Sequence, residues 1–424
     1  MTHYDVLVIG GGTSGMMAAI SAAEHGATVG LIEKNKFVGR KLLVTGNGRC
    51  NVTNNRDKEE IIAHIPGNGR FLYSAFYQYD NYDIMNFFRS RGIALKEEDH
   101  GRMFPTTDKS RTIVNAFKQI IEDLKIDLNT EAPVETVLYD DEKVTGVKLK
   151  DGREFHATSV VLSTGGRAMP RTGSTGDGYK WAKKAGHTIK ELYPTEVPLT
   201  SEEPFIVERT LQGLSLRDVD LKVLNKKNKT VVTHRMDMIF THLGISGPAV
   251  LRCSMFALQT MKRDKSDAAT MAIDSLPDMT LGEMKQRFSQ LKKNEGDRSI
   301  KNVLKQFAPE RYILFGLERH AIDSDKAFKT LTPKEIEQIV TFLKDFRFDI
   351  HGSLPIEKAF VTGGGVHTKE VNPKTLESKK KENLYFTGEI LDYNGYTGGY
   401  NITGAFITGR VAGMHAAETS LSHS

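Results

Sequence analysis

The sequence predicts an α/β protein in which both ends of the chain build one parallel-sheet domain and the middle is inserted. Three observations lead to this prediction. An apolar run at residues 4–9 precedes a glycine-rich turn and a helix. A second glycine-rich stretch, residues 395–404, precedes a helix near the carboxyl end. Between them, residues 196–240 alternate apolar and polar side chains, which is typical of antiparallel strands.

Composition limits the class of protein. The chain has 424 residues, enough for two or three domains, and its 39% hydrophobic and 26% charged residues are ordinary for a soluble globular protein. A net charge of +5 suits anionic ligands without requiring nucleic acid. Two cysteines, Cys50 and Cys253, are too few for a disulfide framework or a thiolate metal cage. We therefore expect no metal site.

Residues 4–33 have the spacing of a dinucleotide-binding unit. A buried strand leads into Gly10, Gly12 and Gly15, a helix follows, and the next strand ends at Glu33. The first glycine allows a tight turn, the second lets the backbone approach a pyrophosphate, and the third lets the helix pack on the strand. The helix start offers free N–H groups to the phosphates, and the acid accepts hydrogen bonds from a ribose. The alternative is a glycine-rich turn in another α/β protein.

Residues 37–54 follow directly and combine glycines, the basic pair Arg40 and Lys41, and small polar residues. Such a segment can wrap a phosphate-bearing ligand with backbone N–H groups and positive charges, although a solvated loop has the same composition. Cys50 has no CxxC partner, so a small buried residue is favoured over a redox thiol. Arg102, between a glycine and an apolar–proline turn, either binds an anionic group or forms a loop salt bridge.

The rest of the first part alternates helices and strands. The predicted helices are 68–91, 109–124 and 177–184, and the predicted strands are 126–128, 132–138, 143–150, 153–157 and 159–166. Strand 159–166 is a buried strand that ends in Thr164, Gly165 and Gly166, and ligands bind at the carboxyl ends of such parallel strands. Val134 is expected near the adenine of a bound dinucleotide.

The middle of the chain reads as an insertion. Strands are predicted at 196–200, 217–224, 230–240 and 346–351, and helices at 248–261, 281–320 and 334–344. Helix 281–320 is rich in lysine, and a solvated face explains this better than an RNA-binding patch. The predicted domains are 1–193 with 354–424, a barrel-like β domain at 194–276 with 344–353, and a helical insertion at 277–343.

The carboxyl-terminal part of the chain again has the sequence pattern of a parallel-sheet domain. We predict a strand at 357–362, and we reject Gly363 and Gly365 as a second dinucleotide fingerprint because polar residues follow instead of an apolar helix. Residues 383–389 look like a protease-tag site, but they lie internally at a strand end. The last predicted helix, 405–417, starts after a glycine-rich turn and accepts another partial negative charge at its N-terminus.

Two such helix starts point to a flavin. One fingerprint serves one ADP moiety, so the distant second unit serves another part of the same ligand. The ring of FAD fits there, because a helix dipole stabilises the negative charge of reduced flavin near N1 and O2. A purely NAD-binding protein would leave residues 388–404 unexplained. We expect a yellow protein that absorbs near ~450 nm.

A set of motifs extends this prediction. They are Gly10-x-Gly12-x-x-Gly15 with Glu33, Gly46–Asn51, Gly101-Arg102-x-Phe104-Pro105, Thr164–Gly166, Gly176–Gly178, Thr241-His242-x-Gly244-x-Ser246-Gly247-Pro248, Gly364–Val366, Gly388–Glu389 and Gly398–Asn401. Together they resemble FAD proteins of the broad fumarate reductase/succinate dehydrogenase class. More closely they resemble the HI0933-like family, which includes aminoacetone oxidase-like and dehydro-bile-acid reductase-like proteins and NAD(FAD)-utilising dehydrogenases.

The resemblance covers nearly the whole chain. It implies a Rossmann-like FAD domain of the glutathione reductase type built from both chain ends, with an inserted barrel-like domain and a small helical subdomain. No segment matches the arginine and histidine catalytic set of fumarate reductases, so the resemblance does not imply a fumarate-type reaction. The candidate FAD-binding residues are Gly10, Gly12, Thr13, Ser14, Gly15, Glu33, Lys34, Arg40, Lys41, Thr45, Gly46, Asn51, Val134, Thr164, Gly165, Gly388, Glu389, Gly399, Tyr400, Asn401 and Ile402.

These features predict a cytoplasmic FAD-dependent oxidoreductase that passes hydride through flavin N5 to or from a small organic substrate. NAD(P)H would bind transiently as donor, because no separate nicotinamide domain is visible. Arg102 and His242 are the candidate catalytic residues; a structural histidine before a glycine turn is the alternative for His242.

Two other functions stay open: reduction of uridine in rRNA, and a non-enzymatic flavin redox sensor. No membrane partner is expected, since no apolar run reaches the roughly 18 residues of a span. The sequence does not define the oligomeric state.

Overall fold

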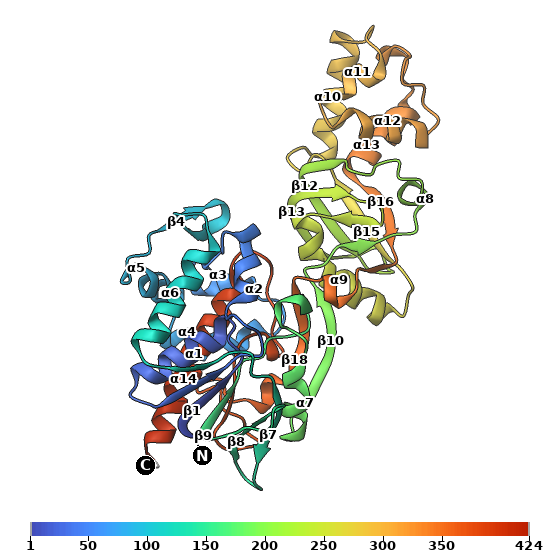
Figure 1. The fold of residues 1–424 in the computed structure, drawn as a ribbon. Helices are drawn as coiled ribbons and strands as arrows, with labels where there is room; N and C mark the ends of the chain where they lie inside the picture. The colour runs from blue at the N-terminus through green and yellow to red at the C-terminus, as the bar shows by residue number, and fades with distance from the viewer. Residues whose placement is uncertain (1, 423–424) are drawn as a thin grey trace. The chain divides into compact units, whose positions relative to one another are not determined.

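The computed structural model describes residues 2–422. The chain forms two compact units, and both chain ends lie in the first of them (Figure 1). Unit 1 comprises Met1–Pro194 and Ile356–Ser424, and unit 2 comprises Thr195–Pro355. The finer three-domain boundaries stay a prediction.

Unit 1 is built on a mixed sheet with a parallel centre. Its strand order is β6-β2-β1-β9-β8-β7, and β19 also pairs with β9. β1 is parallel to β2 and β9, and β19 is parallel to β9. The central strands are apolar on both faces and buried, as strands covered on both sides require. The bounds are β1 Thr2–Ile9, β2 Val29–Ile32, β6 Asp127–Asn129, β7 Val134–Tyr139, β8 Val144–Leu149, β9 Glu154–Leu162 and β19 Leu384–Phe386.

Helices α1 (Thr13–Glu24) and α14 (Tyr400–Ser422) join the two chain ends. Small residues let their backbones approach: a Cβ on Gly409 would lie 2.3 Å from the Ser14 carbonyl oxygen, and one on Gly413 would lie 2.1 Å from that of Ala18. The other elements of unit 1 are α2 Arg40–Val44, α3 Lys58–Ala63, α4 Tyr73–Gln78, α5 Asn81–Arg89, α6 Ser110–Asp123, α7 Asp177–Lys184, β3 Thr53–Asn54, β4 Leu95–Glu98, β5 Arg102–Pro105 and β18 Val361–Val366, which pairs with β10 Ile189–Thr195.

Unit 2 contains an antiparallel sheet with strand order β16-β15-β12-β13-β14-β11-β17. One hydrophobic cluster extends from this sheet into the helical segment, with Phe205, Phe240, Phe342 and Phe346 among its buried rings. Closure of the sheet into a barrel stays a prediction. The bounds are β11 Leu199–Thr200, α8 Pro204–Val207, β12 Ser215–Leu224, β13 Thr230–Phe240, β14 Gly244–Ser246, α9 Pro248–Asp264, β15 Ala269–Asp274, α10 Leu281–Asn294, α11 Ile300–Leu304, α12 Glu310–Arg319, α13 Pro333–Lys344, β16 Phe346–Ile350 and β17 Gly352–Ser353.

Several predicted segments differ from the structure. The predicted strands 153–157 and 159–166 are one strand, β9, which ends at Leu162 and is antiparallel to β8 at its start and parallel to β1. The predicted helix 281–320 is three helices, α10 to α12, and the last helix begins at Tyr400 rather than at residue 405. The bounds of the predicted strand 357–362 are wrong. The strand in this region is β18, which begins at Val361 and contains Gly363, Gly364 and Gly365.

The glycines of β18 explain that last difference. A Cβ on Gly363 would lie 2.3 Å from the ring of Tyr193. Glycine therefore serves close packing against an aromatic ring at this position rather than a turn after the strand.

The lysine-rich segment of unit 2 is largely neutralised by neighbouring carboxylates. Lys301 pairs with Asp325 at 2.6 Å, and Lys305 pairs with Glu310 at 2.8 Å. Lys285 pairs with Glu337 at 2.8 Å. This pattern supports the solvated helical face.

A buried histidine, His187, links β10 to the carboxyl-terminal loop. Its Nε2 lies 2.7 Å from the Ser378 hydroxyl, and its Nδ1 lies 3.5 Å from Glu370. The Ser378 oxygen also accepts backbone N–H bonds from Lys380 and Lys381, so its own O–H donates to the imidazole. Because that oxygen is fully engaged and buried, this Ser–His–Glu arrangement is structural rather than a hydrolytic triad.

We expect His187 to make stability depend on pH. Burial lowers its pKa to about 4, from about 6.5 in the unfolded chain. Above pH 6.5 the neutral ring stabilises the fold fully; as the pH falls towards 4, the unfolded chain takes up the proton first and this stability is lost. Urea unfolding at pH 7 and at pH 5 measures this effect. Between these two pH values, the free energy of unfolding of the wild type should fall by about 2 kcal/mol more than that of His187→Gln. Equal losses in the two proteins would contradict this assignment.

Candidate functional site

The carboxyl ends of three parallel strands meet at one edge of the unit 1 sheet. Ile9 pairs with Leu162, and Leu162 pairs with Phe386. Ser163 follows directly, and its hydroxyl lies 2.6 Å from that of Thr387. Segments more than 370 residues apart in sequence therefore place their glycine turns side by side, because Gly10 directly follows β1 and Gly388 follows β19 after Thr387.

The three fingerprint glycines differ in what surrounds them. Gly10 has φ +107°, and a Cβ there would lie 2.5 Å from the Ser163 carbonyl oxygen. A Cβ on Gly15 would lie 1.8 Å from the Gly10 carbonyl oxygen, so helix α1 packs against the turn itself. A Cβ on Gly12 would meet nothing within 4 Å. Gly12 is the N-cap of α1, and no side chain caps the helix, which leaves an N–H-lined opening suited to a pyrophosphate.

Glu33 is buried at the end of β2, with 8% of its surface exposed. Its Oε2 accepts the N–H of Gly11 at 2.8 Å, and its Oε1 accepts the backbone N–H of Asn35, also at 2.8 Å. These bonds fix the carboxylate beside the glycine turn at residues 10–12, where a pyrophosphate is expected. Oε1 also accepts the side-chain amide of Asn35 at 2.5 Å, so Oε2 is the oxygen that keeps a lone pair for a ribose hydroxyl.

The second helix start lies against the first part of the chain. A Cβ on Gly388, whose φ is +71°, would lie 2.6 Å from the Ser14 hydroxyl. Gly399, with φ +94°, would place a Cβ 2.8 Å from the Thr53 carbonyl oxygen. The side chain of Asn54 donates to the Gly398 carbonyl at 3.0 Å. The loop after α2 and the start of α14 thus form one surface.

Two buried oxygens near these turns have no hydrogen-bond partner among the described residues. They are Asn51 Oδ1, next to Gly399, and Thr164 Oγ1, next to Gly178. A buried polar atom without a partner costs about 1–3 kcal/mol, and a ligand that hydrogen-bonds to it would remove this cost. Together with the open Gly12 and the fixed Glu33, these atoms fit a dinucleotide-linked ring that extends from α1 to α14. The residues present therefore fit FAD.

The predicted charged residues are partly engaged with each other. Lys41 pairs with Glu389 at 2.6 Å, which again connects the two chain ends. Lys34 pairs with Asp177, also at 2.6 Å, and Arg40 donates to Asn35. A bound phosphate would compete with these pairs for the two lysines.

The other predicted cofactor residues lie in the turns of unit 1, at the starts of α1 and α14, or in β7. Thr45 bonds to the Leu42 carbonyl, and Gly46 and Gly165 are left-handed, with φ +56° and +69°. Tyr400 is buried, Asn401 binds the backbone of Gly395 through both amide atoms, and Thr13 and Ile402 lie in the first turns of α1 and α14. Val134 is buried in β7, close to the loop where Ala132 donates to the Glu33 carbonyl.

The two candidate catalytic residues belong to different units. Arg102, in unit 1, lies 3.9 Å from Glu98 and 5.6 Å from the Phe104 ring centroid, so it makes the loop contact that the sequence allowed. His242, in unit 2, is exposed in the turn between β13 and β14. Their catalytic roles stay predictions.

Cys50 is fully buried in the loop that follows α2. Burial raises the pKa of its thiol to about 12, which favours the structural interpretation over a redox thiol.

Sequence reasoning missed three residues that hold the site together. Asn35 fixes both Glu33 and Arg40, and Ser163 joins Thr387 across the sheet edge. A short polar residue within three positions of a strand end is the only local signal for each, and such residues are common.

Two absences apply to the part of the chain that the structure describes. Residues 2–422 contain no cluster of three or more His, Cys, Asp or Glu side chains that could hold a metal ion. None of their helices has both the length and the apolarity needed to cross a membrane.

Comparison with known proteins identifies the family of this chain. The HI0933-like protein Rossmann domain profile matches residues 4–415. The chain is 31% identical over 409 residues to a ribosomal RNA dihydrouridine synthase of Escherichia coli strain K12, covering 96% of both proteins. It is 30% identical over 416 residues to a 3-dehydro-bile acid delta(4,6)-reductase of Clostridium scindens, covering 97% of this chain and 98% of that protein.

Among solved structures, a quinol-fumarate reductase has a TM-score of 0.53 at 15% identity, covering 100% of this chain and 72% of that one. This likeness concerns the fold, and it agrees with the α/β architecture. With the family match over nearly its whole length, the chain belongs to the HI0933-like family and is an FAD-dependent oxidoreductase.

Proposed function

We propose that this protein reduces a carbon–carbon double bond conjugated with a carbonyl group, with FAD held between the starts of α1 and α14 and NAD(P)H as the hydride donor. The observation that carries the proposal is that unit 1 contains both a fixed Glu33 beside Gly11 and an unpartnered Asn51 Oδ1 beside Gly399. When bound, the flavin supplies hydride transfer at N5.

The chain's own residues have separate tasks in this proposal. The N–H groups at Gly12 and Thr13 hold the pyrophosphate, and Glu33 holds the ribose of the adenosine. Asn51 offers its free Oδ1 to a ring N–H, and the dipole of α14 favours negative charge at the pyrimidine end. Burial of these groups keeps bulk water from the ring.

The choice of a conjugated double bond rests on the two relatives. Forming dihydrouridine saturates the C5=C6 bond of a uracil ring, and a delta(4,6)-reductase saturates ring bonds of a 3-dehydro bile acid. In both substrates the double bond is conjugated with a carbonyl. A small unsaturated carbonyl compound is therefore the proposed substrate class.

Uridine in rRNA is the second candidate, favoured by the 31% identity to the E. coli enzyme. The lysine-rich helices of unit 2 do not add to it, because many of their cations are paired with carboxylates. RNA binding would have to use other surfaces, and its affinity would fall steeply with salt.

One anaerobic experiment tests both candidates. The holoprotein is reduced with NADH or NADPH, then mixed with an enone series or with rRNA from a strain that lacks this gene, and reoxidation is followed by flavin absorbance. Mass spectrometry of the product then identifies a saturated enone or dihydrouridine. Failure of either nicotinamide to reduce the flavin would overturn the donor assignment, and no reoxidation by either class would overturn the reaction.

His242→Ala tests the proposed proton-transfer role of this histidine. We expect it to keep the wild-type flavin content, because His242 lies outside unit 1, and to lower turnover about 10²- to 10⁴-fold, the usual contribution of a general acid or base. The matched control is Leu243→Ala, the exposed neighbour in the same turn. If turnover of His242→Ala equals that of this control, His242 has no part in the reaction.

A further inference from the structure

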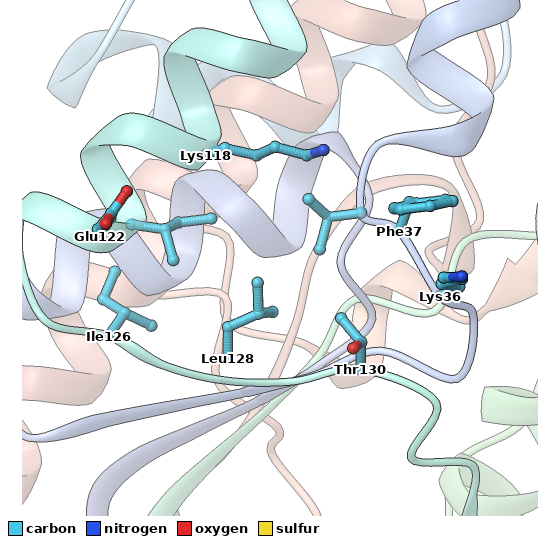
Figure 2. Close-up of a pocket in the computed structure, with 9 residues that line it drawn as sticks. Lys36, Phe37, Lys118, Glu122, Ile126, Leu128 and Thr130 are labelled. Carbon is cyan, nitrogen blue, oxygen red and sulfur yellow. The ribbon is translucent and has the colours of Figure 1, made fainter.

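A groove on unit 1 adjoins the turn at Gly11. It has a volume of about 430 Å³ and runs between helix α6 and the edge strand β6, closed at one end by the loop after β2 (Figure 2). No residue that lines it belongs to the proposed FAD site. Its volume lies within the range of small-molecule sites.

The floor of the groove is apolar. Ile126, directly before β6, and Leu128, within it, are two residues apart and line the same side, and Val38 and Ile121 complete the walls. Ile126, Val38 and Ile121 are buried, whereas Leu128 is half-exposed. Alternation along an edge strand opposite a helix thus leaves an apolar trough open to solvent.

One end of the groove is positively charged. The ring of Phe37 is 54% exposed, and the ammonium groups of Lys36 and Lys118 lie 5.6 Å and 5.4 Å from its centroid. Neither lysine forms an ion pair with any residue in 2–422. Lys118 has Glu122 one helical turn away, yet its ammonium lies over Phe37 instead, and Figure 2 shows Glu122 at the opposite end of the groove.

The groove is anchored to the cofactor turn. Val38 Cγ1 lies 2.6 Å from the place of a Cβ on Gly11, and the N–H of Gly39 donates to the Gly11 carbonyl at 2.8 Å. The wall is therefore held in place by the same turn that faces the pyrophosphate. A rigid wall lowers the ordering cost of binding a ligand.

We propose that this groove binds a flat organic anion, an apolar ring system that carries one carboxylate. The ring stacks against Phe37 and fills the trough over Leu128, and the carboxylate lies between Lys36 and Lys118. Two unpaired cations at one end of an apolar groove complement such an amphipathic anion. A neutral ligand of the same shape would leave both ammonium groups without a partner.

The test is calorimetric titration of the FAD-loaded protein with 1-naphthoate and with its neutral isostere 1-naphthamide. We expect saturable binding of 1-naphthoate at one site per chain, and binding of the amide about tenfold weaker. Lys36→Gln/Lys118→Gln should weaken 1-naphthoate about tenfold and leave the amide unchanged. Leu128→Trp should block both by filling the trough.

The control is Lys293→Gln/Lys334→Gln, which removes two exposed lysines of unit 2. Flavin absorbance and melting temperature verify that every variant is folded, and the exposed lysine pair carries no packing role that would prevent folding. Unchanged 1-naphthoate affinity in Lys36→Gln/Lys118→Gln, equal affinity for acid and amide, or no saturable binding would each overturn the proposal.

Discussion

A Gly15→Ala variant is expected to lose its flavin and to be less stable by about 3 kcal/mol or more. The added methyl group would lie 1.8 Å from the carbonyl oxygen of Gly10 and 3.0 Å from the Ser163 side chain. Neither the turn nor helix α1 can retreat freely, because Gly10 is itself in contact with the Ser163 carbonyl. Flavin-to-protein absorbance after purification and thermal unfolding measure the two effects.

Gly12→Ala is the matched control for this position. Its Cβ would meet nothing within 4 Å, so the apoprotein should unfold within about 0.5 kcal/mol of wild type. The methyl group would nevertheless occupy the opening at the start of α1, so FAD affinity should fall. A Gly15→Ala protein that keeps both flavin and wild-type stability would contradict the assigned packing role.

The second large effect is expected at the other end of the chain, in Gly399→Ala. Gly399 has φ +94°, and its Cβ would lie 2.8 Å from the Thr53 carbonyl and 3.0 Å from Asn51 Oδ1. The clash would displace the loop that carries Asn51 from the start of α14. We expect FAD affinity to fall at least ~100-fold, equivalent to about 2.8 kcal/mol.

Gly152→Ala separates this clash from backbone strain. Gly152 has a nearly equal φ of +90°, and its Cβ would meet nothing within 4 Å. Both variants carry the left-handed penalty of about 1–2 kcal/mol, but only Gly399→Ala should lose FAD. If titration of the two apoproteins with FAD gives the same dissociation constant, the start of α14 is not part of the cofactor site.

Much of the cofactor unit could be predicted from the sequence because its determinants are local. The spacing of Gly10, Gly12 and Gly15 fixes a turn, an opening and a helix contact within six residues, and all three have the expected geometry. The end of a buried apolar strand likewise placed Glu33 next to the turn. Where local pattern and tertiary packing agree, prediction succeeds.

The rest depends on contacts that no local pattern reveals. Gly363 looks like a turn residue, but the ring of Tyr193 makes it a strand residue. The register of β9 on two neighbours of opposite direction merges two predicted strands into one. The carboxylates that neutralise the lysines of unit 2 come from other turns and helices, as Asp325 does for Lys301.

Titration of the apoprotein with FAD and with FMN tests the central claim most directly, because FMN lacks the adenylate half that α1 and Glu33 are proposed to hold. If both chain ends hold one coenzyme, FAD should bind at one per chain and at least ~100-fold more tightly than FMN. Equal affinities, or no binding of either flavin, would contradict the account.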